Sequence, residues 1–452
     1  MTRRELGQAA LGALLNVSTR QQAWSSSFGA PGLAEVSRWR ADFPALNQTV
    51  NGHPLAYLDS AATTQRPAAV LAALLDYYRH DNANPGGTLH ALARRAHEQY
   101  EGARRVLAAF INAADPDEVV WVRGTTEGIN LIASAWARPR LRPGDEVLLT
   151  VAEHTSNLLP WRLLAENTGA ALRYLDVDDE GRVQLDDLDR KLSERTRLLS
   201  FSHVSNVAGY INPAAEICAR ARRAGARVLI DAAQSAPHVP LDVQNLGCDF
   251  LVFSSHKMLG PMGVGVLWGR RELLEDMSPY QAGSNMAHEV GLTSQEFEHA
   301  AHKFGAGTPN VSGPVGLAAA VQYLGNQNRS AIERHEAEPH AIWARAAGRH
   351  PGPATTWTPL RHAAAARLLV RVGRTLSRRN PTAPGYTGNC HPRRRSGRTA
   401  SLEALRRERC CAGVLLLLHA DGGARSARRR AARIDPQPRI RSRHEPNGDR
   451  DH

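Results

Sequence analysis

The 452-residue sequence lacks any apolar run of about 18 residues, the length that a membrane-spanning helix requires. No membrane partner is therefore expected. The chain opens with Met1-Thr2-Arg3-Arg4, and apolar residues follow. Glu5 interrupts this stretch and no convincing small-residue cleavage site follows, so we interpret residues 1–40 as a helical N-terminal extension and not as a secretion signal.

Cysteine is also scarce. The chain has 5 cysteines, an odd number at irregular spacing and without paired CxxC motifs. This pattern excludes a disulfide framework and a zinc site, so no metal is expected. Free thiols are typical of a reducing compartment, and we expect the protein in the cytoplasm.

Lysine is rarer still, because only three of the 56 basic residues are lysines. Most of the remaining positive charge lies at one end of the chain. Residues 341–452 contain 24 Arg, no Lys and 7 acidic residues, whereas the whole chain has a net charge of +12. Residues 1–340 are therefore mildly acidic, and a nucleic-acid partner is not expected for them.

Residues 41–340 alternate short apolar runs with amphipathic stretches, a pattern that predicts an α/β domain with a mainly parallel sheet. The predicted strands are Glu118 to Val122, Glu146 to Val151, Leu198 to Ser202, Arg227 to Ile230, Phe250 to Phe253 and Gly263 to Trp268. The predicted helices are Arg66 to Tyr78, Leu92 to Phe110, Thr126 to Ala135, Leu158 to Asn167, Leu185 to Leu192 and Ala214 to Ala224.

Two chemically distinctive residues follow successive apolar runs in this domain. Asp231 ends the run that begins at Val228, and Lys257 comes shortly after Phe253. A lysine in a dry pocket can lose its proton and condense with an aldehyde, which an arginine cannot do. Pyridoxal 5'-phosphate needs such a lysine, together with an anion at its ring nitrogen and donors around its phosphate.

Each residue alone has a simpler interpretation. Asp231 is typical of a helix cap, and Lys257 of a solvated surface group. Their position after successive strands favours a shared site, because open α/β sheets bind ligands at the carboxyl ends of their strands. The sequence therefore predicts a pyridoxal-phosphate site with Lys257 as its Schiff-base lysine.

A set of short motifs resembles the cysteine desulfurases of the sulfur-mobilisation type, in the class V aminotransferase family of pyridoxal-phosphate enzymes. The resemblance runs from about Phe43 to Glu336. The motifs are Tyr57 to Thr63, Arg123 to Asn130, Glu153 to Asn157, His203 to Val207, the segments around Asp231 and Lys257, and Gly307 to Asn310.

This resemblance implies fold type I, with a seven-stranded, mainly parallel sheet in a large domain and a small C-terminal α+β domain. Thr125, Thr126, Ser254 and His256 would surround the cofactor phosphate. The first two are also typical of simple helix capping. Thr308 resembles the residue that reaches the phosphate of a neighbouring subunit, so the resemblance implies a homodimer.

Three further residues take their roles from the resemblance. His154 resembles the histidine that stacks on the cofactor ring and takes part in proton transfer, although a histidine between a strand and a helix is more often structural. Asn206 and Gln234 would hydrogen-bond the ring hydroxyl. Ordinary loop polarity is the alternative for both.

The reaction of this family converts L-cysteine to L-alanine and leaves the sulfur on an enzyme cysteine as a persulfide, for transfer to an acceptor protein and iron–sulfur cluster assembly. The attacking thiol must be accessible and electropositively placed. Cys218 and Cys248 have the pattern of buried hydrophobic residues. Cys390, which is followed by His391, comes nearest to the family motif and is the candidate nucleophile.

Residues 341–452 depart from the family. They are rich in Arg, Ala and Pro and lack a coherent core pattern. Segments 368–379 and 406–422 can be encoded so that the same one-base shift yields peptides resembling family strands. We therefore expect a remnant of the small domain, partly translated out of frame. A disordered or nucleic-acid-binding tail is the alternative.

Three other functions remain open from the sequence. A related lyase or epimerase would use the same cofactor without needing a cysteine. A catalytically inactive descendant of such an enzyme would bind pyridoxal phosphate without converting any substrate. A nucleic-acid-binding module would depend on the Arg-rich region and bind with a steep salt dependence.

Overall fold

The computed structural model describes residues 33–87, 89–178 and 181–336. The described part begins with helix α2 (Leu33–Ala41). Most of the expected N-terminal extension, the whole region 341–452 and the candidate nucleophile Cys390 lie outside these residues.

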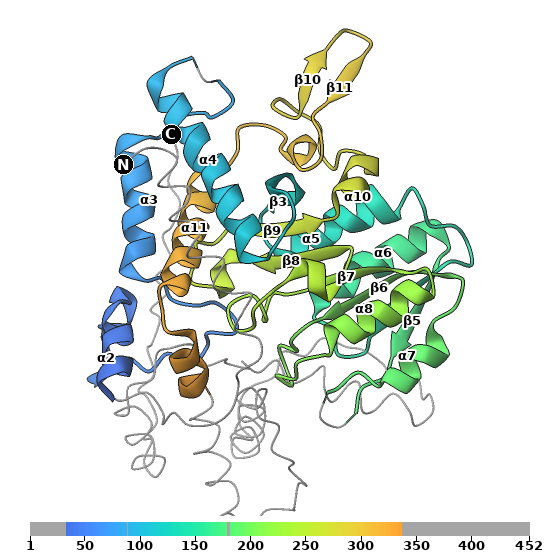
Figure 1. Ribbon diagram of the computed structural model, residues 1–452, viewed down its shortest axis with the longest axis horizontal. Helices are drawn as coiled ribbons and strands as arrows, with labels where there is room; N and C mark the ends of the chain where they lie inside the picture. Colours follow the sequence, from blue (N-terminus) through green and yellow to red (C-terminus); the bar gives the residue numbers. More distant parts are fainter. Residues whose placement is uncertain (1–32, 88, 179–180, 337–452) are drawn as a thin grey trace, which may run out of the picture.

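A seven-stranded sheet forms the centre of the described part (Figure 1). Its strands are parallel except at β9, which is antiparallel to both β3 and β8. This confirms the predicted fold class. In spatial order the strands are β3 (Val119–Val122), β9 (Gly265–Gly269), β8 (Phe250–Ser254), β7 (Arg227–Asp231), β6 (Thr196–Ser202), β4 (Glu146–Thr150) and β5 (Ala171–Leu175).

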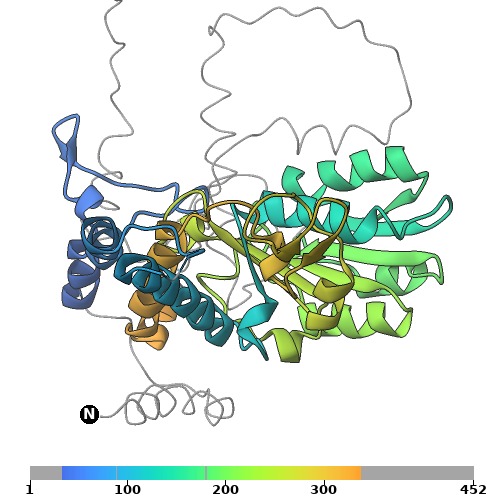
Figure 2. The same cartoon turned by 90° about the horizontal axis from the view of Figure 1, so that it is seen from above.

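Helices cover both faces of the sheet (Figure 2). One apolar cluster includes side chains of α4 (Ala91–Phe110), α7 (Leu185–Lys191), α8 (Ala214–Arg223), α9 (Val243–Leu246) and α11 (Ser312–Gly325). A second cluster on the other face includes side chains of α5 (Thr125–Leu131), the short π-helix η3 (Ile132–Ala137), α6 (Leu159–Thr168) and α10 (Arg271–Asp276). Helix α3 (Ala68–His80) packs against α11.

The central strands contribute to both clusters in alternation. In β7, Val228 and Ile230 belong to the first cluster and Leu229 to the second. Successive side chains of a strand point to opposite faces, so a strand covered on both sides must be apolar at every position. This explains why the predicted strands read as continuous apolar runs.

The predicted strands and helices agree with the structure to within about two residues at each end, the usual uncertainty of element boundaries. The predicted helix from Thr126 to Ala135 comprises α5 and η3. The sequence analysis did not predict the edge strand β5, α11, the short elements α9 and α10, or the hairpins β1 (Thr49–Val50)–β2 (His53–Pro54) and β10 (Ala287–Val290)–β11 (Gln295–Phe297).

Helix α11 was missed because its sequence contains Gly313, Pro314 and Gly316 and has little amphipathic character. Tight packing explains this composition. A Cβ atom on Gly316 would lie 2.9 Å from the Leu74 side chain of α3. The helix contacts both α3 and α4, and most of its residues are buried, so the usual polar stripe is missing.

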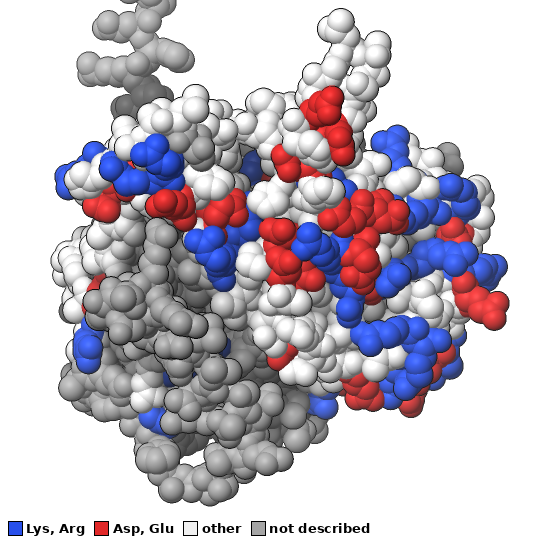
Figure 3. All heavy atoms as spheres, turned by 45° about the horizontal axis from the view of Figure 1, so that its top comes forward, with Lys and Arg blue, Asp and Glu red and all other residues white. Residues whose placement is uncertain are grey.

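On the face shown in Figure 3, basic and acidic side chains are interspersed. Ion pairs among the described residues include Arg197 with Asp145 and Arg227 with Asp249. No helix within residues 33–87, 89–178 and 181–336 is long and apolar enough to cross a membrane. The mixed charge of this face agrees with the prediction that the basic excess belongs to residues 341–452.

Candidate active site

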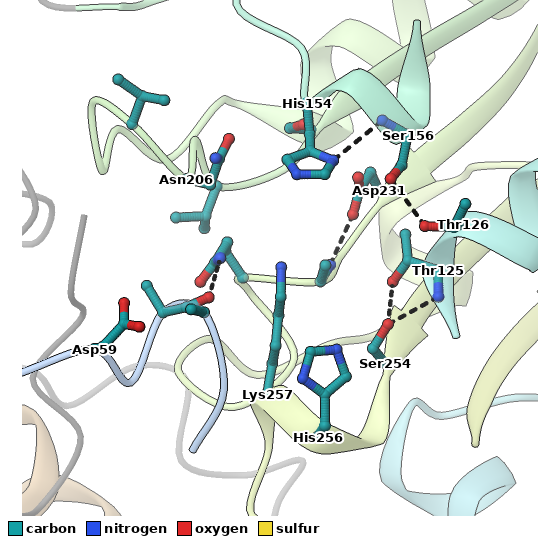
Figure 4. Close-up of a pocket in the computed structure, with 17 residues that line it drawn as sticks. Asp59, Thr125, Thr126, His154, Ser156, Asn206, Asp231, Ser254, His256 and Lys257 are labelled. Carbon is teal, nitrogen blue, oxygen red and sulfur yellow. Dashed lines mark hydrogen bonds between the residues drawn. The ribbon is translucent and has the colours of Figure 1, made fainter. Parts of the chain in front are cut away.

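A cavity of about 420 Å³ opens where β6, β7 and β8 end and α5 begins. All the predicted site residues in the described part except Thr308 line it, as Figure 4 shows. The predicted residues in the cavity wall are Thr125, Thr126, His154, Asn206, Asp231, Gln234, Ser254, His256 and Lys257.

Lys257 lies at the end of a short 3-10 turn, η5 (Ser255–Lys257), that follows β8. A distant part of the chain holds this turn. The backbone N–H and hydroxyl of Thr64 both donate to the His256 carbonyl, at 2.9 and 3.1 Å. The Thr64 hydroxyl also accepts from the Leu259 N–H at 2.8 Å. The lysine backbone is therefore fixed, and its side chain extends into the cavity (Figure 4).

Asp231, the last residue of β7, also faces the cavity and is buried. Its carboxylate accepts from the Ala233 N–H at 2.9 Å. Burial raises the pKa of Asp231 and lowers the pKa of Lys257, while the charge of each opposes the shift of the other. The cavity thus holds a desolvated amine that loses its proton more readily than a free lysine, together with a buried carboxylate.

Hydroxyl groups gather where α5 begins. The Ser254 hydroxyl lies 2.8 Å from the hydroxyl of Thr125 and accepts from its N–H at the same distance. Two glycines allow this close approach. Gly124 has φ of +156°, and a Cβ atom on Gly265 would lie 2.7 Å from the Gly124 Cα. The first turn of a helix leaves amide groups without intrahelical partners and carries the positive end of the helix dipole, so this corner suits an anion.

Thr126 and His256 complete this corner. The Thr126 hydroxyl is 2.8 Å from the hydroxyl of Ser156, which links α5 to the turn that carries His154. The Nδ1 atom of His256 is buried without a hydrogen-bond partner, and burial lowers the pKa of this histidine to about 4. A neutral imidazole with an unpaired buried nitrogen is a group that a bound ligand can satisfy.

His154 lies on the opposite side of the cavity from His256 (Figure 4). Its Nδ1 atom accepts from the Ser156 N–H at 3.1 Å, so in the neutral ring the proton is on Nε2. Burial and then the charge of Lys257 lower the pKa of His154, against the opposing charge of Asp231. The neutral form is therefore favoured at pH 7.

Asn206 and Gln234 also line the cavity. The Gln234 side-chain nitrogen donates to the Ala61 carbonyl at 3.0 Å, which connects the turn after β7 to the segment around Ala61. Their roles toward a ring hydroxyl stay predictions.

Thr308 lies elsewhere, in a second hollow of about 270 Å³ that it shares with Tyr77, Tyr78 and Asn310. Within one chain it therefore does not line the Lys257 cavity. The role toward another subunit that the resemblance implies stays a prediction.

The sequence analysis missed three polar residues of the cavity, Asp59, Ser156 and Ser202. Asp59 and Ser156 belong to motifs that were recognised. Ser202 is the last residue of β6, just as Asp231 and Ser254 are the last residues of β7 and β8. A polar residue at the end of each of these three strands was thus the available indication.

These groups match the needs of pyridoxal phosphate. The desolvated amine of Lys257 can capture an aldehyde, Asp231 offers the buried anion for a ring nitrogen, and the unpaired His256 Nδ1 lies beside the hydroxyl cluster at α5. No group of three or more potential metal ligands occurs in the described residues.

His203, next to the cavity residue Ser202, supplies a testable pH dependence of stability. It is buried with an unpaired Nδ1, and burial lowers its pKa to about 4. The unfolded state then binds more protons than the folded state between pH 6.5 and pH 4. As the pH falls from 6.5 to 4, the free energy of unfolding should therefore decrease, and this residue should account for about 3 kcal/mol of the decrease. Urea unfolding at several pH values gives the free energy of unfolding as a function of pH. This pH dependence should be weaker for His203→Gln than for the unaltered chain, and an identical pH dependence would contradict the assignment.

The two cysteines of the described part are buried and free, as the sequence predicts. Burial raises the pKa of Cys218 to about 12 and that of Cys248 well above its ordinary value. Neither lines the cavity. Both are therefore unsuited to attack as thiolates at neutral pH.

Comparisons with known proteins agree with this site. Residues 56–347 match the family model described as aminotransferase class V. A probable cysteine desulfurase from Synechocystis sp. is 48% identical over 305 residues, covering 67% of this chain and 73% of the relative. One from Streptomyces coelicolor is 47% identical over 317 residues, with coverages of 69% and 75%.

A solved structure shares the fold as well. The crystal structure of the cysteine desulfurase CsdA from Escherichia coli aligns with a TM-score of 0.65 at 39% identity, covering 72% of this chain and 79% of that one. The family match covers more than half of the chain, and both relatives are matched over more than two thirds of their length. The chain therefore belongs to the class V aminotransferase family, in the branch that contains the cysteine desulfurases.

Proposed function

We propose that this protein is a pyridoxal-phosphate-dependent cysteine desulfurase that converts L-cysteine to L-alanine and transfers the sulfur to an enzyme cysteine. The observation that carries the proposal is the meeting of Lys257 and Asp231 in one cavity beside the hydroxyl cluster at α5. The similarity to named cysteine desulfurases narrows the reaction within the family.

The bound cofactor would supply an electron sink for the substrate carbon. The protein's own groups would do the rest. Asp231 would hold the ring nitrogen protonated, because a buried carboxylate favours a neighbouring positive charge. Thr125, Thr126, Ser254 and His256 would bind the phosphate. Lys257, with its lowered pKa, would accept and return a proton at Nζ.

His154 and the two amides would orient the ring. His154 presents Nε2–H in its neutral form and would stack on the cofactor and take part in proton transfer. Asn206 and Gln234 would bind the ring hydroxyl. In this tautomer the proton available to the cavity is the one on Nε2, because the Nδ1 lone pair accepts from the Ser156 N–H.

The attacking thiol must come from outside the described residues, because Cys218 and Cys248 are buried with raised pKa values. We propose Cys390, on the basis of its sequence context. In the step itself, the thiolate sulfur of the enzyme forms a bond with the sulfur of the substrate. The substrate C–S bond breaks, and the carbon takes up a proton to give alanine.

The test of this function is to incubate the full chain, loaded with pyridoxal phosphate, with L-cysteine and a thiol reductant. Alanine and sulfide should form in equal amounts. Cys390→Ala should lower the rate by at least about 100-fold, since it removes the nucleophile. The matched controls Cys218→Ala and Cys248→Ala should turn over normally once their folding is verified. Unchanged turnover in Cys390→Ala would rule out this nucleophile.

One observation favours a second function. The described residues form a full cofactor site yet contain no accessible thiol. A related lyase or epimerase needs no such thiol. Sulfide release that survives in a variant with Cys390, Cys410 and Cys411 all changed to alanine would favour a lyase. Loss of alanine formation in that variant would favour the desulfurase.

We also propose that the protein acts in the cytoplasm and passes its sulfur to an acceptor protein, for example in iron–sulfur cluster assembly. We further propose that it forms a homodimer. The position of Thr308 outside the Lys257 cavity supports the dimer. So does the apolar outer face of α3, where Leu71, Leu75 and Tyr78 are 44%, 48% and 58% exposed. Light scattering should give twice the chain mass of 49.2 kDa.

A further inference from the structure

A buried carboxylate immediately precedes the cavity histidine. Glu153 is only 9% exposed, although the next residue, His154, is open to the cavity. A carboxylate is seldom buried without compensation, because burial disfavours its charged form. Burial does raise the pKa of Glu153. Its hydrogen bonds therefore indicate what holds it in place.

Four donors surround this carboxylate. Oε1 accepts from the Thr150 hydroxyl at 2.6 Å and from the Ser202 N–H at 3.0 Å. Oε2 accepts from the Ser202 hydroxyl at 2.6 Å and from the Asn157 side-chain nitrogen at 2.8 Å. Three of these four donors belong to Thr150 and Ser202, the last residues of β4 and β6. Glu153 thus ties the end of the sheet to the turn after β4.

Asn157 continues the network on the other side of His154. Its side-chain oxygen accepts from the Ser200 hydroxyl at 2.7 Å and from the Trp161 indole N–H at 2.9 Å. Asn157, Ser200 and Trp161 are all fully buried. The turn from 153 to 157 is therefore anchored to the sheet at both ends. Between the anchors, the His154 ring has one hydrogen bond, from the Ser156 N–H to Nδ1.

We infer that Glu153 is a positioning residue that, together with Asn157, aims the His154 ring into the cavity by fixing the turn between them to the ends of β4 and β6. The role of His154 in the reaction rests on the proposed function. The position of its ring does not, and the test below separates the two.

Glu153→Gln is the most direct variant because it keeps the shape and removes two acceptor positions. If the new NH2 group replaces Oε1, it faces the Ser202 N–H. If it replaces Oε2, it faces the Asn157 NH2, whose own oxygen is already in use. An N–H donor cannot become an acceptor, so either orientation breaks a bond. Thr150→Val removes one donor to Glu153 and the acceptor of the Ala152 N–H, and it serves as a milder variant because three donors to Glu153 remain.

Glu118→Gln is the matched control. Glu118 is 8% exposed and accepts from the Trp268 indole and the Ala114 N–H, but it does not line the cavity. Losing its charge should affect stability without affecting His154. Thermal unfolding of all variants shows which of them fold.

The first readout is the rate at which diethyl pyrocarbonate modifies His154 at pH 8 in protein freed of pyridoxal phosphate, measured by peptide mass spectrometry. We expect modification about threefold faster or more in Glu153→Gln, a smaller increase in Thr150→Val and none in Glu118→Gln. Equal rates in Glu153→Gln and the unaltered chain would overturn the inference. An equal increase in Glu118→Gln would do the same, because it would indicate general loosening.

The second readout is the affinity for pyridoxal phosphate in a double-mutant cycle with His154→Ala. Glu153→Gln should weaken binding in the unaltered chain and have no further effect in the His154→Ala background, because its influence passes through that ring. An equal loss in both backgrounds would show that Glu153 acts independently of His154. Neither readout requires turnover, so a chain without desulfurase activity would refute the proposed function and leave this test intact.

Discussion

Lys257→Ala should abolish turnover of L-cysteine and also remove the covalent attachment of pyridoxal phosphate. The Lys257 amine lies in the cavity, and its pKa is lowered by burial, so it is the group able both to capture the aldehyde and to move a proton. Loss of a proton-transfer group costs about 100-fold to 10,000-fold in rate, and the loss of the attachment adds to this. Borohydride reduction followed by peptide mapping measures the attachment directly.

The other two lysines provide the controls. Lys191 pairs with Asp187 at 2.7 Å, and Lys303 donates to the Glu275 carbonyl. Neither lines the cavity. Lys191→Ala and Lys303→Ala should both keep the cofactor on the same peptide as the unaltered chain. Cofactor attached to either of these lysines, or unchanged attachment in Lys257→Ala, would contradict the assignment.

Asp231→Asn should bind the cofactor weakly and lower the rate of alanine formation by about 100-fold or more, because the amide removes the buried negative charge that would hold the ring nitrogen protonated. The variant keeps the shape of the side chain and its acceptor for the Ala233 N–H. It should also lower the pKa of Lys257 further, since Asp231 opposes the effect of burial on that amine. In protein freed of the cofactor, the pH dependence of the rate at which an amine-specific acylating reagent labels Lys257 measures this shift.

Asp249→Asn is the matched control for Asp231. Asp249 is also buried at the edge of a strand, but it lies at the opposite end of the sheet, where it accepts from Arg227 and the Val228 N–H. Its replacement should cost stability and leave the cofactor absorbance unchanged. Equal losses of cofactor affinity in the two variants would indicate that the effect of Asp231 is a matter of folding alone.

Much of the fold followed from local patterns. The strands β4, β6, β7 and β8 were predictable because both faces of the sheet are covered, which forces long apolar runs. The elements that were missed lack such a pattern. The edge strand β5 is only partly buried, and α11 is buried on most sides and contains three glycines and a proline.

The residues that line the cavity were predictable to a similar degree. Asp231 and Ser254 end their strands, and strand ends of a parallel sheet meet at one edge. Contacts between distant segments could not be predicted from the sequence. The hydrogen bonds from Thr64 to the His256 carbonyl join residues 192 positions apart, and no local pattern encodes them. The same holds for the bond from Ser202 to Glu153.

The sequence by itself determined that an aldehyde-capturing lysine and an aspartate follow successive apolar strands, and it determined the motifs that place the chain in its family. Only the tertiary structure decided that Lys257 is desolvated and that Thr308 lies outside the cavity of its own chain. The physical reason is that desolvation and hydrogen bonding between distant segments depend on how the whole chain packs. Residue type and spacing determine which chemical groups are available. Packing determines the protonation state of each group and which groups lie close enough to act together.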